Sequence, residues 1–122
     1  RQHASNAMRA AGVVCMKALG ADKTEADQRM IKHSADALLA VKPEKGSKHY
    51  FYQAYYFATA SNMMGGEYRE NILRKLERFL VKLQNKHGEF RNHHGYEGGV
   101  YATAFSLICL SVRNQFLPIY QE

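Results

Sequence analysis

The sequence predicts an all-α fold of about five helices, organised as two and a half helical hairpins. The prediction rests on a short phrase that occurs twice: Phe57-Ala58-Thr59-Ala60 is matched by Tyr101-Ala102-Thr103-Ala104, 44 residues further along. Each copy lies in a stretch that is apolar on every side, and each is paired with a more amphipathic helical stretch. Hairpins of this kind bury their apolar helices against their neighbours, so we expect them to stack side by side.

Composition places the chain among globular domains. Its 122 residues form one domain at most, and 46% hydrophobic residues with only two prolines exclude a disordered chain. The longest apolar run is much shorter than the roughly 18 residues that a membrane-spanning helix needs. Because the sequence starts at Arg1, we expect residues 1–122 to be a single helical-repeat domain from the C-terminal part of a longer protein.

Capping signals and helical spacing predict the first hairpin. A helix is expected over residues 6–19, with Ser5 as its N-cap and Gly20 as its stop. A second helix follows Thr24, which forms a near capping box with Asp27, and this helix closes at Pro43. Its apolar stripe consists of Met30, Ile31, Ala37, Leu38 and Val41.

The second hairpin combines the most uniformly apolar helix with the most amphipathic one. The third helix is expected from about residue 47 to the glycines at 65 and 66, and its density of Tyr, Phe and Ala is typical of a helix packed on every side. The fourth is expected over residues 67–86, with Glu70 and Arg74 spaced for an ion pair. One face of it carries Tyr68, Ile72, Leu73, Leu76, Phe79, Leu80 and Leu83.

A half hairpin completes the chain. A loop rich in Gly and His covers residues 88–99, a fifth helix is expected over residues 100–115, and an apolar strap follows at residues 116–120. The first, third and fifth helices are therefore predicted to be inner, and the second and fourth outer. Cys15 and Cys109 lie in apolar helical patterns and are expected to be buried thiols, which fits a reducing compartment such as the cytoplasm without specifying it.

The end of the fourth helix carries a motif that resembles a known family. Residues 84–90 read Gln-Asn-Lys-His-Gly-Glu-Phe, which is similar to the QW repeat of squalene and terpenoid cyclases, with Phe90 in place of Trp and His87 in place of the acid. Together with the repeated Ala-Thr-Ala phrase, it resembles the repeats that these cyclases share with protein prenyltransferases. The resemblance implies a partial α/α toroid. Gln84, Gly88 and Phe90 are expected to be structural, because they suit a helix end, a positive φ and a gap between hairpins.

The resemblance also implies a cavity at one end of the inner helices. Its candidate lining is aromatic and imidazole-rich: Tyr52, Tyr55, Tyr56, His93, His94, Tyr96 and Tyr101. The Asp-rich acid motif of the cyclases and the Asp-Cys-His zinc set of the prenyltransferases have no counterpart in the sequence, so no catalytic residue, metal or cofactor is predicted.

The sequence therefore favours a non-catalytic helical-repeat module that acts as a scaffold or binding surface. Its partner is expected to be the rest of a longer parent chain or a second copy, because the inner helices are too apolar to face water. The alternative is a fragment of an enzyme that binds an isoprenoid or another apolar ligand in a toroid. Nucleic-acid binding is disfavoured in spite of the net charge of +6, because the basic residues form no tail and no reader motif.

Overall fold

The computed structural model describes residues 5–42, 49–91 and 99–114, and these residues are all-α, as predicted. No β-strand occurs within these three ranges, and a single antiparallel bridge joins Gln84 to Phe90. The helices are α1 (Asn6–Ala18), α2 (Glu25–Leu39), α3 (Tyr50–Met64), α4 (Gly66–Tyr68), the π-helical turn η1 (Arg69–Leu73), α5 (Arg74–Leu83), α6 (Gly99–Ser111) and the 3-10 turn η2 (Val112–Asn114).

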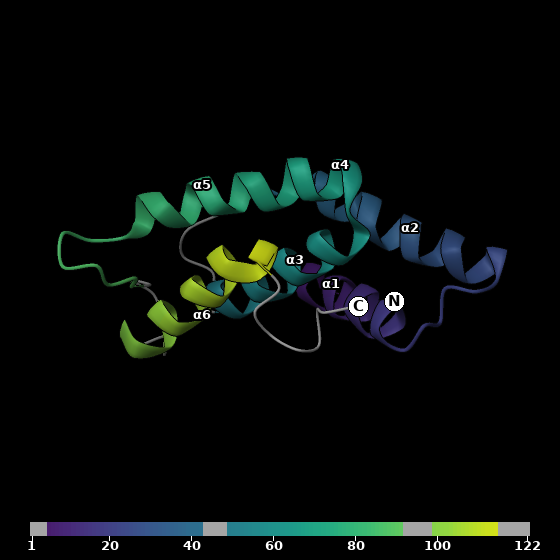
Figure 1. Ribbon diagram of the computed structural model, residues 1–122, viewed down its shortest axis with the longest axis horizontal. Helices are drawn as coiled ribbons and strands as arrows, with labels where there is room; N and C mark the ends of the chain where they lie inside the picture. Colours follow the sequence, from purple (N-terminus) through teal and green to yellow (C-terminus); the bar gives the residue numbers. More distant parts are fainter. Residues whose placement is uncertain (1–4, 43–48, 92–98, 115–122) are drawn as a thin grey trace.

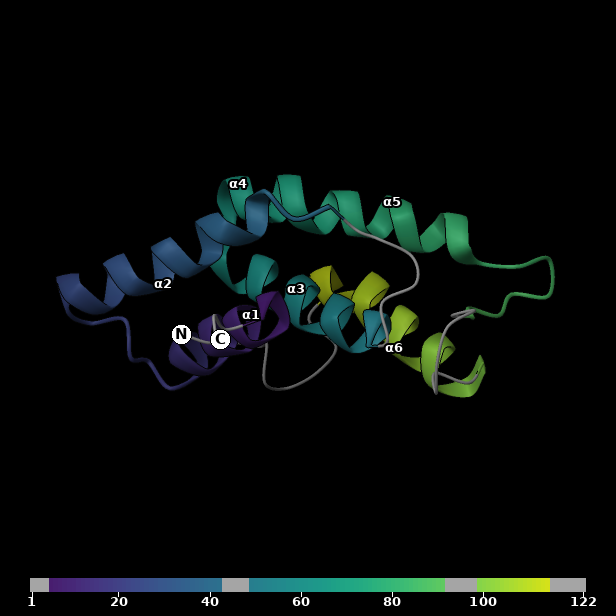
Figure 2. The ribbon, with the colours of Figure 1, turned by 180° about the vertical axis from the view of Figure 1, so that it is seen from behind.

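The helices form two layers (Figure 1). The first layer contains α1, α3 and α6, and the second contains α2 and the continuous α4–η1–α5 rod. The view from behind shows the same division (Figure 2). The predicted alternation is therefore present along the described residues: α1 is followed by α2, α3 by the α4–η1–α5 rod, and the rod by α6. No helix in the part of the chain that the structure describes has the length and apolar character needed to cross a membrane.

Side-chain caps fix the starts of α1 and α2 where the sequence predicts them. The Ser5 hydroxyl accepts a hydrogen bond from the backbone N–H of Met8 at 3.3 Å. The Thr24 hydroxyl accepts one from the N–H of Asp27 at 3.1 Å and donates to the Asp27 carboxylate at 2.6 Å. Each cap satisfies a helix-end amide that has no partner within the helix.

Helix α3 is the centre of the fold, and it lies against α1, α6 and η1. Nine of its residues are buried: Tyr50, Phe51, Ala54, Phe57, Ala58, Thr59, Ala60, Ser61 and Asn62. Two buried polar residues near the C-terminal end of α3 bond to backbone: Ser61 donates to the Phe57 carbonyl at 2.6 Å, and Asn62 donates to the Val112 carbonyl at 3.3 Å. The prediction that α3 is packed on every side is confirmed for most of the helix, but Tyr52 is exposed and Tyr55 and Tyr56 are half-buried.

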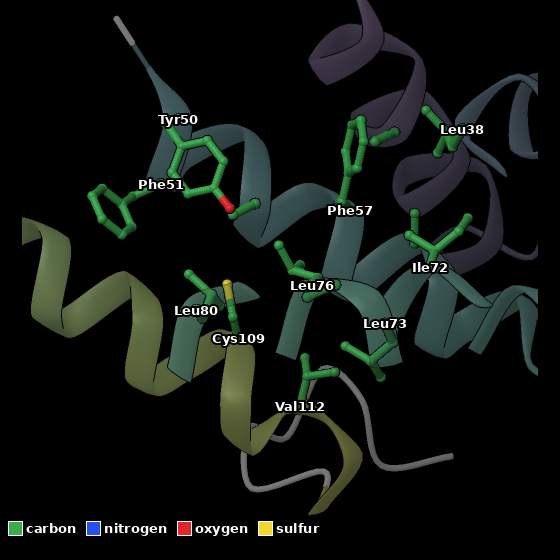
Figure 3. Close-up of a cluster of buried hydrophobic side chains, with 14 of the residues drawn as sticks. Leu38, Tyr50, Phe51, Phe57, Ile72, Leu73, Leu76, Leu80, Cys109 and Val112 are labelled. Carbon is green, nitrogen blue, oxygen red and sulfur yellow. The ribbon is translucent and has the colours of Figure 1, made fainter. Parts of the chain in front are cut away.

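The α4–η1–α5 rod covers the first layer with its leucines. Ile72, Leu73, Leu76 and Leu80 are buried, as the amphipathic pattern predicts. Figure 3 shows these side chains together with Tyr50, Phe51 and Phe57 of α3 and with Cys109 and Val112 beyond them. The rod begins at Gly66 and ends at Leu83, three residues before the predicted end, because Gln84 adopts an extended conformation and pairs with Phe90.

The predicted ion pair between Glu70 and Arg74 is replaced by another. Glu70 contacts Arg113 at 3.5 Å, and the same guanidinium contacts Glu77 at 2.7 Å. Arg113 thereby ties the end of α6 to the second layer, and the Glu77 carboxylate raises the pKa of Arg113 above its ordinary value.

A tyrosine joins the two helices of the second layer. The Tyr68 hydroxyl donates to the Asp36 carboxylate at 2.5 Å, and Lys32 donates to the same carboxylate at 2.8 Å. These two donors hold the pKa of Asp36 below its ordinary value, with Lys32 as the larger cause. The pKa of Tyr68 is raised by partial burial and by the hydrogen bond to Asp36.

Two expectations about burial in the first hairpin are wrong, and both concern helix faces with no neighbour. Cys15 is exposed rather than buried, because α1 turns Ala10 and Val13 toward the core and carries Cys15 on the opposite side. Met30 is exposed rather than part of the core stripe, because α2 buries Ile31, Ala35 and Leu38 instead. Cys109 is buried as expected, and removal from water raises the pKa of its thiol to about 12.

The two thiols should therefore differ sharply in reactivity. We expect one equivalent of a thiol reagent to label the native chain at neutral pH, and two after denaturation, because only the thiolate reacts and Cys109 keeps its proton. Absorbance of the released chromophore checks this. The Cys15→Ser variant should lose the rapid reaction; a fast reaction that persists in it would contradict the assigned burial of Cys109.

Candidate binding face

A row of aromatic rings crosses from α3 to α6. Tyr52 and Tyr56 lie 4.9 Å apart, and Tyr56 and Tyr55 lie 5.1 Å apart, measured between ring centroids. Phe105 of α6 continues the row, 5.6 Å from Tyr55 and 4.6 Å from Tyr101. Most of these pairs meet edge to face, a favourable arrangement of aromatic quadrupoles. Four of the tyrosines chosen from the sequence are thus brought together, and Phe105 joins them as a residue that sequence reasoning did not single out.

The aromatic row belongs to a wider apolar surface on the first layer. On α1, Met8, Gly12, Cys15 and Leu19 are exposed at spacings of four, three and four residues, which places them along one stripe. On α6, Val100 is 89% exposed and Leu107 is 56% exposed. We call the exposed apolar residues of α1 and α6, together with the aromatic row, the open face. Large exposed apolar surfaces mark interaction sites in soluble proteins.

The repeated phrase shows how the open face of α6 arises. Ala60 of α3 is buried, whereas Ala104, its equivalent in α6, is exposed. Likewise Phe57 is buried and its equivalent Tyr101 is partly exposed. Helix α3 lies between α1 and α6, whereas α6 lies mainly against α3, with smaller contacts to α5 and η2. The expectation that the last helix is buried on all sides is therefore wrong, because the same sequence pattern meets a neighbour on only one side.

Within the row, the phenol of Tyr56 is electrostatically distinctive. Its pKa is raised above the ordinary tyrosine value, first by a hydrogen bond with Tyr52, then by partial burial and by the neighbouring Tyr52, Tyr55 and Cys15. Since the neutral phenol is favoured in the folded chain, the stabilisation is fully present below the unfolded pKa of about 10 and is lost as pH rises through the folded pKa.

Removing the Tyr52 hydroxyl should expose this coupling. In the Tyr52→Phe variant we expect the Tyr56 ring to titrate at lower pH than in the wild-type chain, because the hydrogen bond to Tyr52 is the main cause of the raised pKa. Carbon-13 shifts of the tyrosine rings, followed from neutral to alkaline pH, measure the change. A Tyr55→Phe control should move the Tyr56 titration less, and an unaltered Tyr56 titration in Tyr52→Phe would refute the proposed bond.

The motif residues Gln84, Gly88 and Phe90 meet in the loop after α5. Gln84 donates from Nε2 to the Gly88 carbonyl at 3.0 Å, and Gly88 has φ of +84°, a conformation that favours glycine. Asn85 Oδ1 accepts from the N–H groups of His87 and Glu89 at 2.9 and 3.0 Å. The loop delivers Phe90 to the core, where it is 1% exposed and its N–H donates to Thr103 of α6 at 3.1 Å.

The other three candidate residues, His93, His94 and Tyr96, lie outside the described residues. Among residues 5–42, 49–91 and 99–114, no group of three or more His, Cys, Asp or Glu side chains is placed to hold a metal ion.

A cavity of about 440 Å³ lies between the two layers. It is lined by α3 positions Tyr50, Gln53, Ala54 and Phe57, whose spacing places them on one helix face. Tyr52, Tyr55 and Tyr56 lie on the other side of α3, so the cavity and the open face are separate. Because α3 is apolar all round, its sequence pattern gave no reason to choose the face that lines a hollow.

Comparison with protein-family models, curated proteins and solved structures finds no match for this chain. The class of protein is thus defined by the fold alone: an all-α domain of two layered helical hairpins and a further half hairpin.

Proposed function

We propose that this chain is a non-catalytic helical-repeat module that binds through its open face. The observation that carries the proposal is the aromatic row, which joins the exposed sides of α3 and α6 into one apolar surface. Aromatic side chains are enriched at protein interfaces because they provide large contact area at low conformational cost. The alternation of layers supports a partial α/α toroid, in which further hairpins of a longer parent would continue the first layer.

The aspartates support a structural rather than a chemical role. Asp22 pairs with Lys17 at 2.7 Å, Asp27 bonds to the Thr24 cap, and Asp36 pairs with Lys32 and Tyr68. Each of the three aspartates of the sequence is thereby engaged in a local contact outside the open face. Protonation of an alkene requires a buried carboxylic acid with a raised pKa. The contacts described here have the opposite effect, because Lys17 lowers the pKa of Asp22 and Lys32 lowers that of Asp36.

In the absence of a parent chain, a second copy is the partner that the open face would take. The chain carries a net charge of +6, so two copies repel each other at low salt. Apolar association should therefore strengthen as salt screens this repulsion. Nucleic-acid binding would weaken under the same change, because it depends on the release of counterions from phosphates.

Sedimentation velocity of the 122-residue chain at rising concentration tests the proposal. We expect concentration-dependent association that Leu107→Arg reverses, because Leu107 is 56% exposed on the open face and a buried unpaired charge there opposes association. Val81→Arg is the matched control, since Val81 is 58% exposed on the second layer. A wild-type chain that stays monomeric at every concentration would overturn the proposal, as would equal effects of the two arginine variants.

The alternative function, an enzyme fragment that binds an isoprenoid, draws support from the same aromatic row. A prenyl chain would lie across Tyr56, Phe105 and Tyr101 through apolar contact. Titration with farnesol, followed by tyrosine fluorescence, discriminates between the functions. Saturable quenching that Tyr101→Ala weakens would favour the isoprenoid function, whereas no quenching would favour the protein-binding function.

A further inference from the structure

Three parts of the chain form most of the lining of the cavity between the layers, and Asn6 at the start of α1 completes it. One wall is the face of α3 that carries Tyr50, Ala54 and Phe57. The second is the C-terminal end of α2 and the segment that follows it. The third comes from η1 and α5.

Chemistry divides this cavity into an apolar floor and a cationic rim. Ala54, Phe57, Ile72 and Leu76 are buried and form the floor. The exposed lining residues include Lys42, which follows α2, and Lys75 of α5, so the two cations come from different walls. Gln53 and Asn6 add amide donors, and none of the described lining residues carries a carboxylate. The described lining residues therefore carry positive charge at the rim and apolar side chains at the floor.

We infer that this cavity binds an apolar anion: a hydrocarbon chain seated against the floor, with its carboxylate at Lys42 and Lys75. Its volume of about 440 Å³ lies within the range of about 300–1,000 Å³ that is typical of small-molecule sites. The ligand class follows from complementarity, because an apolar body removes water from Phe57 and Leu76 while an anionic end meets the two ammonium groups. A neutral chain of the same length makes the apolar contacts with the floor but forms no ion pair with Lys42 or Lys75 at the rim.

This site is independent of the open face. Tyr50, Ala54 and Phe57 lie on the side of α3 that faces the second layer, and the aromatic row lies on the other side. A ligand in the cavity contacts neither Tyr101 nor Leu107. Binding is therefore expected in the Leu107→Arg variant as well as in the wild-type chain, and the failure of one proposal leaves the other standing.

Isothermal titration with fatty-acid salts, each below its micelle concentration, tests the inference. We expect decanoate to bind with one-to-one stoichiometry and each methylene from hexanoate to decanoate to tighten binding by about fourfold. Longer chains should gain nothing once they outgrow the cavity. Decanol, which lacks the charge, should bind more weakly. Lys42→Gln and Lys75→Gln should each weaken decanoate binding by about two- to fivefold, with smaller effects at high salt.

Matched variants keep the test decisive. Lys82→Gln is the control for Lys75→Gln, because Lys82 is exposed on α5 outside the cavity. Ala40→Phe places a ring in the rim and should abolish binding, and Ala26→Phe is its control at an exposed α2 position. Circular dichroism verifies the helices of each variant.

Three outcomes would overturn the inference. The first is no saturable decanoate binding. The second is equal affinity for decanol together with unchanged affinity in both lysine variants. The third is loss of binding in Leu107→Arg but not in Ala40→Phe, because it would place the ligand on the open face.

Discussion

Replacing Phe90 with alanine is expected to lower the free energy of unfolding by about 3–5 kcal/mol. The ring is 1% exposed, and it enters the core from a loop rather than from a helix. Its loss removes the apolar contact and leaves a cavity that a loop held by Gln84, Asn85 and Gly88 is poorly able to fill. Since a domain of this size is stabilised by roughly 5–15 kcal/mol, a large part of the total is at stake.

Urea denaturation followed by circular dichroism measures this loss. Thr103→Val separates two contributions, because it removes the hydroxyl that accepts from the Phe90 N–H at 3.1 Å and keeps the ring in place. We expect it to cost about 1–3 kcal/mol. If Phe90→Ala proved no more harmful than Thr103→Val, the ring would not be the structural anchor of the loop.

Leu80→Ala should have an effect of similar size, about 2–5 kcal/mol. Leu80 is fully buried, and its side chain lies with Cys109 in the cluster between α5 and α6 (Figure 3). Truncation leaves a void between the two layers, and the cost depends on how far α5 can settle onto α6. The urea midpoint should fall while the dependence on urea concentration stays the same, because the surface exposed on unfolding is nearly unchanged.

Val81→Ala is the control for Leu80→Ala, one residue away on the same helix. Val81 is 58% exposed, so its truncation should change stability by less than about 0.5 kcal/mol. Comparable losses in the two variants would mean that the assigned face of α5 is wrong. A loss confined to Leu80→Ala would agree with the helix orientation described above.

Local signals in the sequence specified the helices and their starts. Ser5 and Thr24 cap α1 and α2 because a short hydroxyl side chain reaches a free amide within the next turn, which depends on a few neighbouring residues only. The leucine stripe of α5 likewise reports which face is buried, since one side of that helix is charged.

The same local signals do not predict which residues of α1 and α6 are buried. Both helices are apolar on several faces, and the number of neighbours, rather than the pattern, determines which face is covered. Cys15 and Leu107 are exposed for this reason although their surroundings in the sequence are as apolar as those of Cys109. The residues that line the cavity were not predicted, because a hollow depends on how far apart its walls stand, and this distance is not encoded in periodicity.

The candidate site was predicted in part. The tyrosines of α3 and Tyr101 were chosen for their density and their repeat, and they form one row with Phe105. The sequence does not connect Lys42 with Lys75, because nothing in it shows that residues so far apart line the same cavity.

The π-helical turn over Arg69–Leu73 has a consequence for relatives of this protein. Such a turn holds one residue more than an α-helical turn, and it has the form of a single-residue insertion absorbed without breaking the rod. Proteins that share this architecture are therefore expected to differ by one residue in length here, and alignments should place a gap within this turn while the leucines that follow stay in register.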